Sequence, residues 1–200
     1  MPAIKDITQL GKLIALQHGW AAAKAFKAYE MDEADQAALS HCAIDLLKIF
    51  PPTPDTSALM SAALAVSLER HMKAPIHVVA GTLALEGVPV FGNRQPFDGS
   101  QVLGTSSSDW NGHVWVMIGP YVVDISIFRT AYSAEGPARL AKHIDLTFGP
   151  KKGLYVDHWK RTRQVGLNYE PQYVLDADEV TALMGRAFDI IKQARPASAS

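Results

Sequence analysis

The chain has 200 residues, of which 48% are hydrophobic, and its 19 basic and 20 acidic side chains give a formal net charge of -1. This size and apolar content predict a single globular domain with a buried core. No basic run is longer than "KRTR" at 160–163, so nucleic acid is not expected as the main partner. The longest apolar stretch, 58–68, is too short to span a membrane, and the first residues lack a signal-peptide pattern. We therefore expect a cytoplasmic protein of bacterial type.

The first third of the chain is predicted to be helical. Residues 7–29 read as one or two helices, and residues 31–50 form another, with acidic residues in its first turn and a Pro-Pro pair after it. The only cysteine, Cys42, lies inside this second helix among apolar neighbours, which favours a buried structural thiol over a nucleophile. A single cysteine also excludes an internal disulfide and a cysteine-based zinc site, and we expect no metal and no cofactor.

A third helix should begin near Asp55, Thr56 or Ser57, each of which is a suitable N-cap residue. Small or apolar residues occur on every side of this helix up to about residue 72. Such a pattern is typical of a central helix that is packed on most of its circumference.

The middle of the chain is predicted to be a mostly antiparallel sheet. Residues 76–92 are rich in β-branched side chains and contain a turn at Gly87, and a polar loop then leads to a hairpin at 113–126. A short helix around 136–144, a mixed segment and a final helix to about residue 194 complete the chain. We expect one domain over 1–194, with a helical layer over about 1–50, and a disordered tail at 195–200.

The hairpin contains one histidine, His113, and one aspartate, Asp124, among apolar residues. A two-residue turn at Gly119 and Pro120 would place His113 opposite Ser126, and Asp124 would then share its face. Such diagonal neighbours have Cβ atoms roughly 7–8 Å apart, within reach of an imidazole and a carboxylate. An odd loop or a bulge would separate the two groups.

A carboxylate beside a histidine fixes the tautomer of the ring and stabilises the imidazolium, as a general base requires. The same pair can also be purely structural, since a polar pair on one face helps to set the register of a sheet. Both interpretations stay open at this level, because the pair of His113 and Asp124 lacks an identified nucleophile.

Two stretches resemble a known family. "GHVWVMIGPYVVDIS" at 112–126 is similar to the histidine and aspartate strands of transglutaminase-like proteins, which belong to the papain-like cysteine hydrolase superfamily. "ALMSAALAVSLERHMKAPIHVVAGTL" at 58–83 resembles the nucleophile helix and following strand of that family. The likeness covers residues from about 55 to 126. It implies an α+β fold of the papain/transglutaminase type, in which a central nucleophile helix packs on an antiparallel β-sheet, here with N-terminal helices.

The resemblance also implies a Cys-His-Asp triad, in which His113 is the base and Asp124 orients it. The position of the nucleophile falls on Ala58, which has no nucleophilic atom. Three explanations are open: an introduced replacement of a natural cysteine, a natural pseudoenzyme, or the use of Ser57 instead. The implied activity is hydrolysis of, or acyl transfer from, a peptide or protein amide by a peptidase, deamidase or transglutaminase-like enzyme.

Residues near the triad are candidates for substrate binding: Ser57, Trp110, Asn111 and Gly112. The last three directly precede His113 and are candidates for a substrate groove or an oxyanion site, although each also suits a turn into the strand. The rival function is a non-catalytic protein of the same fold that holds a peptide in this groove, in which Ala58 would be native. The sequence leaves the substrate and the oligomeric state open.

Overall fold

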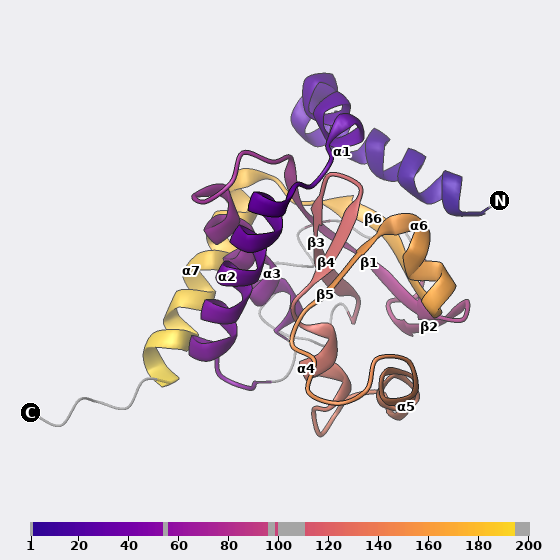
Figure 1. Ribbon diagram of the computed structural model, residues 1–200, viewed down its shortest axis with the longest axis vertical. Helices are drawn as coiled ribbons and strands as arrows, with labels where there is room; N and C mark the ends of the chain where they lie inside the picture. The colour runs from indigo at the N-terminus through magenta and orange to yellow at the C-terminus, as the bar shows by residue number, and fades with distance from the viewer. Residues whose placement is uncertain (1, 54–55, 96–98, 100–110, 195–200) are drawn as a thin grey trace, which may run out of the picture.

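The computed structural model describes residues 2–53, 56–95, 99 and 111–194, and over this part of the chain it is an α+β structure (Figure 1). Its helices are α1 Pro2–Ala28, α2 Glu33–Ile49, α3 Ser57–Glu69, α4 Ile127–Ala131, α5 Ala138–Thr147, α6 Trp159–Thr162 and α7 Ala177–Ala194. Its strands are β1 Ile76–Leu85, β2 Val88–Phe91, β3 His113–Ile118, β4 Tyr121–Asp124, β5 Tyr155–His158 and β6 Leu167–Val174. The expected tail at 195–200 lies outside the described residues.

The element α1 consists of two helices that meet at Gly19, whose φ of 86° is outside the helical region. The second helix folds back along the first, since a Cβ added to Gly11 would lie 3.2 Å from Cε of Lys27. Glycine tolerates this backbone conformation because it has no side chain. The sequence left open one helix or two, and the structure has two.

Helices α2 and α3 follow their predicted boundaries. The side chain of Asp32 accepts a hydrogen bond from the backbone N–H of Asp35 and so caps α2, and Cys42 is buried within it, as expected. Thr56 is the N-cap residue of α3. Most residues of α3 are buried, which confirms the prediction of a central helix.

All strand pairs described in the sheet are antiparallel, as the sequence predicted. The order is β2-β1-β3-β4-β5, and β6 pairs with β1. Val79 of β1 has Trp115 of β3 as one partner and Val174 of β6 as the other, so β6 lies along the opposite edge of β1 from β3. Strand β6 lies in the segment for which the sequence predicted only mixed structure.

The sheet has a hydrophobic cluster on each face. Side chains of α2, α3 and α7 form the first cluster with Val114, Val116 and Ile118 of β3. Side chains of α1, α4 and α5 form the second cluster with Trp115 and Met117 of β3. The two sets alternate along β3, as successive side chains of a strand point to opposite faces. Figure 1 shows α2, α3 and α7 together on one flank of the sheet.

Within the described ranges, no helix combines the length and the apolar character that crossing a membrane requires.

Candidate functional site

His113 and Asp124 are in direct contact. Nε2 of His113 lies 2.5 Å from Oδ2 of Asp124, and the exposed fractions of the two side chains are 1% and 0%. Strands β3 and β4 pair Ile118 with Tyr121, so the turn at Gly119 and Pro120 has the two residues that the sequence predicted. The predicted contact between His113 and Asp124 is confirmed.

The carboxylate of Asp124 accepts hydrogen bonds at both oxygens. Oδ1 accepts from the backbone N–H and hydroxyl of Ser126 and from the N–H of Ile127, each at 3.0 Å. Oδ2 accepts from His113 and, at 2.9 Å, from the hydroxyl of Tyr169. A buried carboxylate needs such donors, because it has lost its hydration.

These contacts decide the charge of Asp124. Burial raises the pKa of the carboxyl group, but the charge of His113 and the hydrogen bonds from His113, Ser126 and Tyr169 together outweigh burial. The pKa of Asp124 therefore lies below its ordinary value, and the group is ionised at neutral pH. An ionised acceptor requires a proton on Nε2 of His113, so that Nδ1 is the nitrogen that can act as a base.

Aromatic rings hold the imidazole of His113 in place. The ring of Phe91 stacks on it with centroids 5.5 Å apart, and the ring of Trp115 lies nearly parallel to it at 6.4 Å. The ring of Tyr169 also lies at 6.4 Å, tilted by 47°. The dyad of His113 and Asp124 is thus fixed by packing as well as by hydrogen bonds.

The N-terminus of α3 lies near the end of β3 that carries His113. The hydroxyl of Ser61 donates to the carbonyl of Val114 at 3.0 Å, and Ser57 and Ala58 precede Ser61 by about one helical turn. However, Ala58 packs against the first cluster, whereas the rings around His113 belong to or pack on the second. The structure thus joins His113 to Asp124 and places position 58 at the same end of the sheet, against the other cluster.

The remaining predicted site residues lie at the entrance to β3. Asn111 is exposed and its carbonyl accepts a hydrogen bond from the N–H of Gly92 at 3.1 Å, while Gly112 is half-buried. Trp110 lies outside the described residues. Asn111 therefore ties the entrance of β3 to the end of β2, and its role in binding a substrate stays a prediction.

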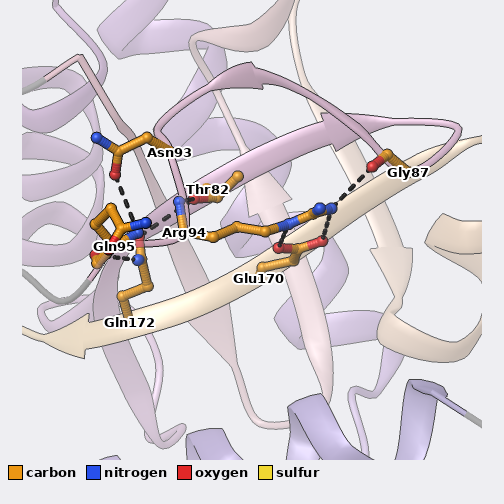
Figure 2. Close-up of polar contacts among 7 residues, drawn as sticks. All are labelled: Thr82, Gly87, Asn93, Arg94, Gln95, Glu170 and Gln172. Atoms are coloured by element: carbon orange, nitrogen blue, oxygen red, sulfur yellow. Dashed lines mark hydrogen bonds and ion pairs between the residues drawn. The ribbon is translucent and has the colours of Figure 1, made fainter.

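Residues 92–95, which follow β2, are held against β1 and β6 by a set of polar contacts (Figure 2). The guanidinium of Arg94 donates to both carboxylate oxygens of Glu170, at 2.6 and 2.7 Å, and to the carbonyl of Gly87 at 2.9 Å. The N–H of Arg94 donates to the hydroxyl of Thr82 at 3.2 Å. Arg94 is exposed, so these contacts fix the path of the chain next to Phe91 and the dyad and add little to stability.

Sequence reasoning missed two neighbours of the dyad, Phe91 and Tyr169. Tyr169 comes from β6, and its only sequence signal is the tyrosine-containing stretch "LNYEPQYV", which Pro171 interrupts. His77 of β1, which the sequence did not single out, is also buried. His77 is 8% exposed, and among the described residues its Nε2 has no hydrogen-bond partner.

Among the described residues, no group of three or more His, Cys, Asp or Glu side chains could hold a metal ion.

Comparison with protein-family models, with curated proteins and with solved structures gives no match for this chain. The transglutaminase-like fold and the triad therefore stay predictions that rest on the quoted residues. The α+β class, the antiparallel sheet and the dyad come from the structure itself.

Proposed function

We propose that this fold supports thiol-dependent hydrolysis of, or acyl transfer from, peptide or protein amides, as in papain- and transglutaminase-like enzymes. The observation that carries the proposal is the dyad, in which an ionised, fully buried Asp124 holds the imidazole of His113 in one tautomer. Position 58, near the same end of the sheet, is the proposed place of the nucleophile. The chain with Ala58 lacks the thiol that the reaction needs.

With a cysteine at position 58, the proposed reaction begins with proton transfer to His113. Because Ala58 packs on the opposite face of the sheet from the ring of His113, the proposal requires the thiol to reach Nδ1 of His113 around the end of the sheet. Nδ1 then takes the thiol proton, and the thiolate attacks the carbonyl carbon of the amide. The imidazolium returns the proton to the leaving amine as the C–N bond breaks, which leaves a thioester. Water or a second amine, deprotonated by His113, then attacks the thioester carbonyl. The C–S bond breaks, the imidazolium returns the proton to the departing sulfur, and the acid or the new amide is released. Asp124 stays ionised throughout and stabilises the imidazolium.

The α3 dipole alone would be a weak activator of this thiol. A helix N-terminus stabilises a negative charge by about 0.3–1 kcal/mol, which is less than one pKa unit. Most of the activation must therefore come from His113. This dependence on one side chain makes the proposal testable.

The alternative is a non-catalytic protein that binds a peptide. Three observations favour it: position 58 carries a methyl group, the dyad is almost completely buried, and Ala58 packs on the opposite face of the sheet from the ring of His113. In that case His113 and Asp124 serve to fix the register of β3 and β4.

The two functions can be separated by cysteine reactivity in a background with Cys42→Ser. We expect Ala58→Cys to react with iodoacetamide near pH 6 faster than Ala58→Cys with His113→Ala by on the order of tenfold or more, since the ion pair with His113 favours the thiolate. Ser57→Cys is the matched control, because its thiol lies at the same helix terminus. It should react at a rate close to that of an ordinary thiol.

Equal rates for Ala58→Cys with and without His113 would refute the hydrolase proposal and leave the binding protein. If Ser57→Cys alone shows the dependence on His113, the nucleophile position is 57, and Ser57 becomes the candidate nucleophile of the chain as it stands.

A further inference from the structure

The dyad has a third member that comes from a distant part of the chain. The hydroxyl of Tyr169 donates to Oδ2 of Asp124, the same oxygen that faces Nε2 of His113. Tyr169 is 7% exposed and lies on β6, which pairs with one edge of β1, whereas β3 and β4 lie beyond the other edge. The hydrogen bond therefore joins residues from opposite sides of β1. A single carboxylate oxygen therefore links three strands.

The ring of Tyr169 cannot swing away from this contact without moving its neighbours. It packs edge-on against Trp115 with centroids 5.1 Å apart and stacks on Tyr155 at 6.2 Å with an interplanar angle of 8°. On β1, Gly81 makes room for this arrangement. A Cβ at Gly81 would lie 2.1 Å from the carbonyl oxygen of Glu170 and 3.0 Å from the ring of Trp115.

We propose that Tyr169 is a positioning residue for the dyad: its hydroxyl fixes Oδ2 of Asp124 and so sets the orientation of the His113 ring. The contact itself is independent of any activity, whereas its value for catalysis rests on the proposed function. The hydroxyl also takes up part of the negative charge on Asp124, because a hydrogen bond to a carboxylate favours its ionised form.

Tyr155 provides a matched control within the same aromatic stack. It is 5% exposed and stacks directly on Tyr169. Its hydroxyl is buried, however, and has no hydrogen-bond partner among the described residues. Tyr155→Phe and Tyr169→Phe therefore each remove one buried hydroxyl from adjacent rings, and only the second removes a contact with the dyad.

The first experiment is NMR on the chain with Ala58, which needs no nucleophile and no substrate. The proton on Nε2 of His113 should resonate far downfield, because it lies in a short hydrogen bond to a carboxylate. We expect Tyr169→Phe to shift this resonance and to move the carbon-detected titration of Asp124 to higher pH. Tyr155→Phe should leave both unchanged.

Equal behaviour of the two variants would overturn the proposal. If Tyr169→Phe does not fold, 3-fluorotyrosine incorporated at position 169 alone replaces it. Its phenol is more acidic and nearly the same in shape, so it should shift the His113 resonance, and an unshifted resonance would refute the role.

A second experiment asks whether the positioning matters for chemistry. In the Ala58→Cys background with Cys42→Ser, Tyr169→Phe should change the pH profile of alkylation, and Tyr155→Phe should not. If the NMR effect is present while reactivity at position 58 is independent of His113, the proposed function fails but the positioning of Asp124 by Tyr169 stands.

Discussion

Two buried histidines on neighbouring strands, His113 and His77, differ in their hydrogen-bond partners. His113 has a carboxylate at hydrogen-bond distance, and among the described residues the rings of Phe91, Trp115 and Tyr169 surround it. Nε2 of His77 has no hydrogen-bond partner among the described residues, and its ring centroid lies 5.0 Å from that of His18 and near Phe26. Burial and, to a smaller extent, the charge of His18 lower the pKa of His77 to about 4. His77 is therefore neutral in the folded protein at neutral pH.

This predicts a loss of stability in acid. The folded pKa of His77 lies below the ordinary value of 6.5, so the unfolded chain binds a proton first as the pH falls. The stabilisation is complete above pH 6.5 and is lost between about pH 6.5 and 4, by about 3 kcal/mol. Urea unfolding of His77→Leu across this range should show a free energy that falls less steeply than that of the unchanged chain.

Leu16→Ala is the control for this prediction, because Leu16 is 83% exposed and has no titratable group. It should unfold with the same pH dependence as the unchanged chain. An unchanged slope for His77→Leu would show that His77 keeps its ordinary titration in the folded state.

At the scale of the elements, β1 has the most strand neighbours of the sheet. It pairs with β2, β3 and β6, and its pairing with β6 shifts register between Ala80 and Gly81. That irregularity brings the backbone of β6 too close to Gly81 for any side chain there. The position of Tyr169 beside the dyad depends on this close approach.

We therefore expect Gly81→Ala to destabilise the protein strongly, by about 2 kcal/mol or more, because the added Cβ overlaps backbone that cannot move alone. Gly185→Ala in α7 is the matched substitution, since no atom lies within 4 Å of the added Cβ. It should stabilise the protein by about 0.5–1 kcal/mol through helix propensity. Thermal and urea unfolding of both variants test the difference in sign. Similar effects would mean that β6 can withdraw from β1.

At the scale of the whole molecule, helices cover both faces of the sheet. Helices α2, α3 and α7 pack on one face, and the two helices of α1 cover part of the other (Figure 1). The face under α1 is also the one that carries Trp115 and the rings around His113. The helices of α1 therefore belong to the same hydrophobic cluster as Trp115 and Tyr169, whose rings lie against His113.

Two neighbouring residues of α1 test this docking. Ile14 is fully buried against the second cluster, whereas Leu16 is 83% exposed. We expect Ile14→Ala to cost about 2–5 kcal/mol of unfolding free energy, and Leu16→Ala to change it by no more than about 0.5 kcal/mol. Chemical denaturation measures both. A small effect of Ile14→Ala would show that α1 is not docked on the sheet in solution.

The sequence by itself determined the parts of this protein that depend on local chemistry. The acidic first turn and the Pro-Pro pair predicted the ends of α2, and N-cap residues predicted the start of α3. Glycine and proline predicted the turns of β1–β2 and β3–β4, and apolar residues on all sides predicted the burial of α3. The alternation of a strand, together with an even turn, was sufficient to bring His113 and Asp124 to one face. These predictions need only neighbours within one helix or one hairpin.

Only the tertiary structure decided which distant residues complete the site. Tyr169 is 45 residues from Asp124 along the chain, and the edge of the sheet at which β6 pairs brings the two together. In the same way, the cluster that contacts Ala58 follows from the packing of α3 against α2 and α7, while His113 lies among rings on the other face. No local pattern encodes these contacts, because they arise from long-range strand pairing and from the burial of two separate apolar clusters on one sheet.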